Sequence, residues 1–237
     1  DISWVIGQFA DAADRVKRSG FDGIEIHGAH GYLISTFLSP RYNKRDDEYG
    51  GSVENRARLL TDVVTAVRAR CGKDFAVIVR IDGREYAEGG IDPELAAQYA
   101  VLAEAAGADA IHVSASSPDA MGAGFTDGPL PWQPDQYLGL AAVVKLAVSV
   151  PVIAVGRILP DAAEKHLKAG DCDFVSMGRQ PLPDPDIPAK LRADRPDRVT
   201  PCPNCLVCVA RNFWGGARIC AIHAQTCSLH GGTYTPP

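Results

Sequence analysis

The sequence has no long apolar run, no excess of positive charge and no leader of the secretory kind. No apolar stretch approaches the ~20 residues that a membrane-spanning helix needs. A formal net charge of -5 provides no basic face for nucleic acid. Residues 1–20 have an amphipathic helical pattern without the basic start and small-residue cleavage site of a signal peptide. These absences exclude membrane and nucleic-acid partners and indicate a cytoplasmic protein.

Cysteine is scarce outside one cluster near the C-terminus. Four of the 7 cysteines follow the spacing Cys-x2-Cys-x2-Cys-x11-Cys, namely Cys202, Cys205, Cys208 and Cys220. The odd total and the clustering favour a metal site in a reducing compartment over a disulfide framework. Four thiolates this close can surround a zinc ion or a [4Fe-4S] cluster. Zinc sites usually pair two separate Cys-x2-Cys knuckles, so three cysteines within seven residues favour the cluster, and zinc is the alternative.

Short β-branched runs alternate with helical patterns along the chain. Strands are predicted at 22–27, 76–81, 109–115, 151–156 and 173–178, and helices at about 53–70, 93–106, 134–147 and 160–169. Alternating strands and helices are typical of a parallel α/β sheet. A closed (β/α)8 TIM barrel needs eight strands. We therefore expect the last five strands of a TIM barrel, in a chain that begins inside a longer barrel protein.

The composition changes after the last predicted strand. A proline-rich stretch, QPLPDPDIPAKL, leads into the cysteines, and the final residues resemble a linker. We expect a barrel portion at 1–195, a cysteine module at 196–227 and a linker-like tail at 228–237. No G-x-G-x-x-G phosphate loop occurs, so FAD and NAD(P)H are expected only on a further domain or on a partner protein.

Candidate catalytic groups follow the first predicted strand. His27, His30 and Tyr32 lie within six residues. Active groups of barrel enzymes lie at the carboxyl ends of strands. Two imidazoles and a phenol at that edge can bind a substrate oxygen and deliver a proton, because a phenol keeps its proton near neutral pH. The alternative is a pair of structural histidines with a tyrosine in a turn.

Candidate cofactor groups follow the later strands. Arg80 closes the second predicted strand and needs an anion, which is either the edge of a reduced flavin or a nearby acid such as Asp82. Gly156-Arg157 and Gly178-Arg179 follow the last two strands, where this fold binds phosphate. The phosphate of FMN is the expected ligand there, and ordinary turn glycines are the alternative.

The run IEIHGAHGYLISTFLSPRYNKRDDEYGGSVENRARLL resembles the NADH:flavin oxidoreductase family related to old yellow enzyme. The cysteine module points to the branch that includes 2,4-dienoyl-CoA reductase and trimethylamine dehydrogenase. The resemblance implies that His27 and His30 hold the substrate oxygen over FMN and that Tyr32 protonates the substrate carbon. It also implies that Arg80 contacts the flavin and that a [4Fe-4S] cluster on the four cysteines exchanges electrons with it.

Three functions remain open at this point. We expect reduction of activated C=C bonds of the enoate, enone or dienoyl type, because amine dehydrogenases of this branch carry tyrosine at the position of His27. Amine oxidation is the first alternative, and a non-catalytic electron-transfer fragment that bears a cluster is the second. The loop 116–132 lacks the second catalytic histidine of dienoyl-CoA reductases, which argues against that particular substrate. The expected partners are an unsaturated small molecule and an electron donor, with a homo-oligomer left open.

Overall fold

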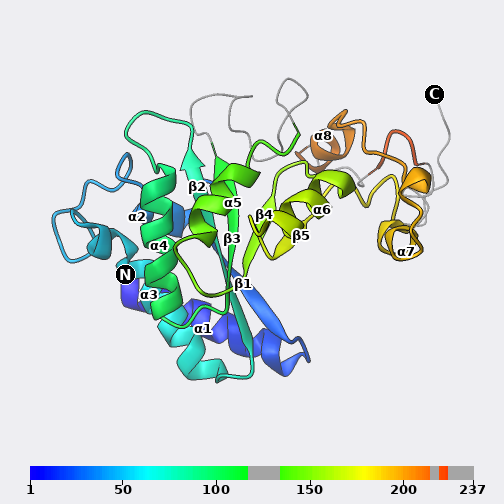
Figure 1. The fold of residues 1–237 in the computed structure, drawn as a ribbon. Helices are drawn as coiled ribbons and strands as arrows, with labels where there is room; N and C mark the ends of the chain where they lie inside the picture. The colour runs from blue at the N-terminus through cyan, green and yellow to red at the C-terminus, as the bar shows by residue number, and fades with distance from the viewer. Residues whose placement is uncertain (117–133, 214–218, 224–237) are drawn as a thin grey trace.

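Five parallel strands form one sheet in which spatial order follows chain order. The computed structural model describes residues 1–116, 134–213 and 219–223. The strands are β1 (Gly23–Gly28), β2 (Ala76–Glu85), β3 (Ala110–Ser116), β4 (Val152–Val155) and β5 (Phe174–Ser176). A helix lies between each strand and the next, as Figure 1 shows. This confirms the predicted α/β class and its five strands. Most of the predicted substrate loop, the tail and Cys227 lie outside the described residues.

The helices begin and end where local sequence signals place them. Ser52 and Asp92 accept hydrogen bonds from the backbone at the starts of α3 and α4, and Gly170 ends α6 in the left-handed conformation. None of the helices in the described residues is long and apolar enough to cross a membrane. The helices are α1 (Ile2–Arg18), α2 (Leu33–Leu38), α3 (Val53–Cys71), α4 (Pro93–Ala105), α5 (Leu138–Lys145), α6 (Pro160–Ala169), α7 (Ile187–Arg192) and α8 (Val207–Phe213), with a short 3-10 turn, η1, at Pro196–Arg198.

Some elements differ from the sequence prediction. Helix α5 is shorter than the predicted 134–147, and α2, α7 and α8 were not predicted. These three helices have only six or seven residues each. A segment this short is below the ~11–18 residues over which a helical hydrophobic repeat can be detected. Strand β2 also continues beyond Arg80 to Glu85, with an irregularity in its pairing between Asp82 and Glu85. Arg80 therefore lies inside a strand and not at its end.

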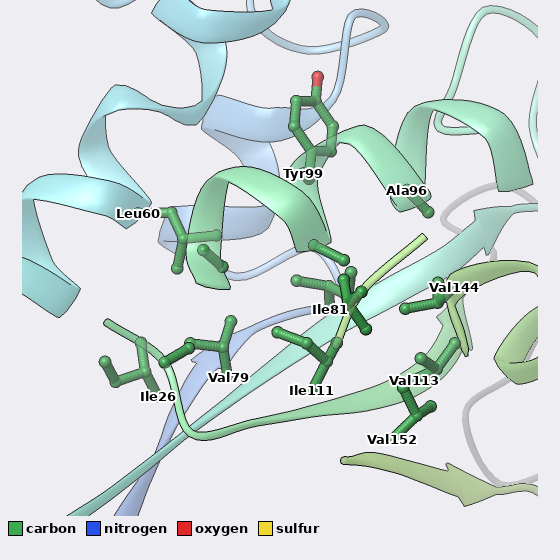
Figure 2. Packing of buried hydrophobic residues seen from close by; sticks show 14 of the residues in the cluster. Ile26, Leu60, Val79, Ile81, Ala96, Tyr99, Ile111, Val113, Val144 and Val152 are labelled. Carbon is green, nitrogen blue, oxygen red and sulfur yellow. The ribbon is translucent and has the colours of Figure 1, made fainter. Parts of the chain in front are cut away.

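Alternate side chains of each strand pack against the helices. Val79 and Ile81 of β2 and Ile111 and Val113 of β3 are almost fully buried there, and Figure 2 shows them in one cluster with Leu60 of α3 and Val144 of α5. Because strand side chains alternate in direction, the residues between them face the other side of the sheet. On that side the first three strands carry charged and polar groups, namely Glu25, His27, Arg80, His112 and Ser114. The fold thus separates an apolar core from a polar face.

Gly83 of β2 tests this packing. A Cβ added at Gly83 would lie 2.7 Å from Val113 Cγ1 and 2.9 Å from Leu140 Cβ. Gly83→Ala should therefore lower the free energy of unfolding by ~1–3 kcal/mol through overpacking. Urea denaturation measures the change.

Gly139→Ala is the matched control, because a Cβ at this exposed position of α5 would meet nothing within 4 Å. Alanine within a helix should raise stability by ~0.5–1 kcal/mol. Equal effects of the two substitutions would contradict the described contact of β2 with β3 and α5.

Candidate active site

The three predicted catalytic side chains lie together at the end of β1. The ring centroids of His27 and His30 are 5.0 Å apart, and those of His27 and Tyr32 are 5.1 Å apart. A left-handed turn brings them together, with φ of 64° at His30 and 74° at Gly31. Tyr32 is 63% exposed, so its hydroxyl is accessible to a small molecule.

A buried carboxylate holds this turn. Asp82 of β2 is fully buried, and its Oδ2 accepts hydrogen bonds from the His30 backbone N–H at 2.8 Å and from Ser35 Oγ at 3.1 Å. Ser35 Oγ in turn accepts from the Gly31 N–H at 3.2 Å. A left-handed conformation is strained for a non-glycine residue. Asp82 and Ser35 therefore stabilise a turn that His30 would otherwise adopt at a cost.

A chain of hydrogen bonds links His30 to Arg80 through Ser114 of β3. Arg80 Nη2 donates to Ser114 Oγ at 3.3 Å, and Ser114 Oγ lies 2.7 Å from His30 Nε2. Because Arg80 donates to the oxygen of the Ser114 hydroxyl, this arrangement favours a Ser114 proton that points at His30 Nε2. His30 then carries its own proton on Nδ1. That N–H is the group it can offer to a substrate oxygen.

Both histidines of this cluster are neutral near pH 7. Burial lowers the pKa of His30 to about 3, and the positive charge of Arg80 adds to the effect. Burial and Arg80 also lower the pKa of His27 below its ordinary 6.5. A neutral imidazole polarises a carbonyl by hydrogen bonding and does not supply a full charge.

Arg80 pairs with an acid other than the one the sequence suggested. Its Nη1 lies 4.0 Å from Glu25 Oε1, whereas Asp82 binds the His30 turn. Glu25 also lies 2.7 Å from His112 Nδ1, so His112 makes a structural hydrogen bond to this carboxylate. Burial would raise the pKa of Glu25, yet the hydrogen bond and charge of His112, with that of Arg80, lower it overall. This carboxylate is thus ionised beside Arg80.

Sequence reasoning assigned no role to Ser114 and Ser35 and considered Asp82 only as a partner of Arg80. Ser114 lies on β3 at the second position after the residue paired with Arg80, so the parallel register brings it beside that strand. The period-two pattern of β3 could have indicated that its side chain faces inward. The role of Ser35 depends on a short helix that the pattern did not reveal.

A cavity of about 290 Å³ extends from Arg80 to both glycine-arginine turns. Its volume is near the lower end of the ~300–1,000 Å³ typical of ligand pockets. Arg157 and Arg179 line the same cavity, and burial together with the charge of Arg179 lowers the pKa of Arg157. Two guanidinium groups on the wall of one cavity provide a suitable environment for a phosphate dianion.

Backbone geometry adds to this fit. Gly156 has φ of 132°, and a Cβ there would lie 2.5 Å from Tyr137 Cδ2, so only glycine fits. At Gly178 a Cβ would meet nothing within 4 Å, so the space before that turn is open. Arg80 Nε is buried without a hydrogen-bond partner among the described residues. A bound group with an acceptor at this end of the cavity would satisfy it, and the residues present fit FMN.

The four predicted ligand cysteines surround one small hollow beside this cavity. Cys202, Cys205, Cys208 and Cys220 all line it, and Cys202 lines the larger cavity as well. A tetrahedral zinc site needs sulfurs ~3.8 Å apart, since Zn–S is ~2.3 Å. In the described part of the chain, no group of three or more His, Cys, Asp or Glu could hold a single metal ion. The four thiols therefore line one hollow, but in the described residues they do not form a single-ion site.

The pH dependence of stability should reveal the buried carboxyl of Asp82. Burial raises the pKa of Asp82 to about 7 from its ordinary 3.8. Between these values the folded chain binds a proton that the unfolded chain has released, so stability falls as the pH rises through the window. Asp82→Asn removes this loss. The unfolding free energy of the variant minus that of the wild type should increase from about pH 4 to about pH 7.

Urea denaturation across that range measures the difference. The lowered pKa of His30 acts in both proteins and largely cancels. Asp22→Asn, at an exposed position, is the control for the loss of one carboxyl group. A difference between Asp82→Asn and the wild type that stayed constant with pH would show that Asp82 is ionised throughout.

Known proteins are similar in sequence to this chain over most of its length. An N,N-dimethylglycine/sarcosine dehydrogenase of Chromohalobacter salexigens is 40% identical over 229 residues, which are 95% of this chain and 33% of that protein. A cinnamate reductase of Clostridium sporogenes is 34% identical over 221 residues, 86% of this chain and 33% of that protein. The chain spans about a third of the length of each of these two relatives.

A solved structure and a family model complete the comparison. The structure of 2-naphthoyl-CoA reductase with 2-naphthoyl-CoA superposes with a TM-score of 0.87 at 29% identity, covering 95% of this chain and 34% of that one. Together with the five parallel strands, this likeness confirms the predicted partial (β/α)8 barrel. The family model matches residues 1–198. The chain therefore belongs to the NADH:flavin oxidoreductase / NADH oxidase family.

Proposed function

We propose that this chain forms the catalytic part of an FMN- and [4Fe-4S]-dependent oxidoreductase that reduces activated C=C bonds. The observation that carries the proposal is the hydrogen-bonded path from His30 through Ser114 to Arg80. It joins the cluster of His27, His30 and Tyr32 to the cavity that ends at the two glycine-arginine turns. Substrate groups and cofactor groups thus meet at one place.

The residues divide the chemistry between them. Bound in the cavity and reduced, FMN would supply the hydride chemistry for reduction at the carbon β to the substrate carbonyl. Negative charge then develops on the carbonyl oxygen, and His30 Nδ1–H is available to stabilise it together with His27. The Tyr32 hydroxyl delivers a proton to the α carbon, which completes the saturated product. Arg80 holds its charge at the same end of the cavity and favours a negatively charged flavin edge there.

The other end of the cavity and the cysteine hollow provide for FMN and for its electrons. Gly156-Arg157 and Gly178-Arg179 are proposed to bind the phosphate. Cys202, Cys205, Cys208 and Cys220 are proposed to hold the [4Fe-4S] cluster, and Cys202 lies on the wall between the two sites. A flavin or nicotinamide group on another domain or protein would then have to supply the electrons. The cytoplasm, with its reduced thiols, is the proposed compartment.

Amine oxidation is the second candidate, because a relative with 40% identity is named as a dimethylglycine and sarcosine dehydrogenase. There the hydride would pass from the amine carbon to the flavin, and no proton donor to carbon would be needed. An exposed phenol beside two neutral histidines favours ene reduction. Anaerobic mixing of the oxidised protein with a tertiary amine decides between them, since only an amine dehydrogenase would lose its flavin absorption.

An absorption spectrum tests the cofactor content. The chain purified without oxygen should show flavin bands and a broad sulfur-to-iron shoulder, and dithionite should bleach the two with different shapes. A shoulder without flavin bands would support the fragment that only carries a cluster. Neither signal, in a folded chain, would refute the proposed cofactors.

Tyr32→Phe tests the proton donor. The variant keeps the ring beside His27 and loses only the hydroxyl, so the rate of enone reduction should fall ~10²–10⁴-fold. Its absorption spectrum should be unchanged. Tyr42→Phe, at another exposed tyrosine, is the control and should keep the wild-type rate. An active Tyr32→Phe enzyme would assign proton delivery to another group.

A further inference from the structure

The cysteine loop at residues 200–204 is hydrogen-bonded to the chain that leaves β5. We propose that Gln180 is a positioning residue that fixes Cys202 at the wall between the flavin cavity and the cysteine hollow before any cofactor binds. This inference rests on the proposed function for the roles of the two sites. The order that Gln180 imposes on the loop depends only on the contacts of the chain itself.

Gln180 binds the loop with both ends of its side-chain amide. Its Nε2 donates to the Thr200 carbonyl at 2.9 Å, and its Oε1 accepts from the Cys202 N–H at 2.8 Å. The side chain is only 6% exposed. The Gln180 amide thus provides the two hydrogen bonds that a neighbouring β-strand would otherwise give to the Thr200 carbonyl and the Cys202 N–H. Buried groups left without these partners would be costly.

The sequence of the loop leaves few other ways to satisfy its backbone. Pro201 and Pro203 have no N–H, so residues 200–203 offer only the N–H groups of Thr200 and Cys202. Asp184 Oδ2 accepts from the Thr200 N–H at 2.8 Å, and Gln180 accepts from Cys202. Every backbone donor of this stretch is therefore bound by a side chain from residues 180–184. The loop has a single hydrogen-bonded register.

Neighbouring contacts hold the loop at a third point. Arg179 Nη1 donates to Asn204 Oδ1, and Asn204 is 5% exposed with φ of 55°. Lys190 holds Asp184 with Nζ 2.7 Å from Oδ2. Thr200, Cys202 and Asn204 are thus anchored at alternate positions. Of these anchors, Gln180 is the one bonded directly to a cysteine of the cluster.

The position of Cys202 explains why this anchor matters. Cys202, Asn204 and Arg179 line both the flavin cavity and the cysteine hollow. A shift of the loop would move a sulfur ligand and one wall of the flavin site together. Gln180 therefore couples the geometry of the two sites through a single amide group.

Alkylation of cysteines in the reduced, chelator-treated chain tests the proposal without any cofactor. Gln180→Leu keeps the size of the side chain and removes both hydrogen bonds. Iodoacetamide should then modify Cys202 ~tenfold faster than in the wild type, as followed by peptide mass spectrometry. The matched control is Gln98→Leu, because Gln98 on α4 binds only the Glu94 carbonyl within its own helix. Cys71 and Cys172, which are buried in the barrel, should stay protected.

A wild-type rate at Cys202 in Gln180→Leu, with Cys71 and Cys172 protected, would overturn the proposal. If those two cysteines also react faster, Gln180→Lys decides. It keeps a donor for the Thr200 carbonyl and loses the acceptor for the Cys202 N–H. Faster reaction limited to the cysteine loop would then support the inference, and a wild-type rate would refute it.

Iron reconstitution separates this inference from the proposed function. If the wild-type chain binds no iron, the proposed cluster is wrong, whereas the alkylation contrast still measures the order of the loop. If the wild type binds iron and FMN, Gln180→Leu should retain several-fold less of each. Full retention of both would show that Gln180 does not position Cys202 for them.

Discussion

The contacts of Arg80 connect the two parts of the site, namely the cluster of His27, His30 and Tyr32 and the cavity at the glycine-arginine turns. It lies inside β2, where a charge can face the polar side of the sheet only if neighbouring strands compensate it. Glu25 from β1 supplies an opposite charge at 4.0 Å, and Ser114 from β3 accepts a hydrogen bond. Burial nonetheless lowers the pKa of Arg80. The guanidinium is thus held in place while its Nε still lacks a partner among the described residues.

The buried carboxyl of Asp82 holds the left-handed turn at His30. A carboxyl group with a pKa of about 7 is an expensive choice for holding a backbone N–H. It nevertheless accepts two hydrogen bonds through one oxygen and keeps His30 in a left-handed conformation. That conformation directs the ring of His30 toward His27 and Ser114. Burial of Asp82 thus lowers the stability of the fold, and the hydrogen bonds that Asp82 accepts fix the orientation of His30.

Local signals in the sequence were sufficient for much of this arrangement. The alternating pattern located all five strands because one face of each packs against helices, and the position after β1 identified His27, His30 and Tyr32.

Contacts between distant segments could not be predicted from local patterns in the same way. Ser114 became important only because the register of β2 and β3 sets it beside Arg80. The predicted end of β2 was too early, because the alternation of apolar and polar residues stops after Asp82 and the following residues resemble a turn. Gln180 gave no signal, since its partners lie 20 and 22 residues further along the chain.

The division of the site among strands has a consequence for how such a protein can diversify. The groups proposed to meet the substrate lie on or next to β1, β2 and β3, whereas the glycine-arginine turns and the cysteine loop follow β4 and β5. Only Arg80 belongs to both sets. If the proposed roles hold, substitutions near His27 and Tyr32 would alter which bond is oxidised or reduced and would leave the proposed electron supply undisturbed. One set of cofactor-binding turns would in this way serve many substrates, with evolution acting on each half almost independently.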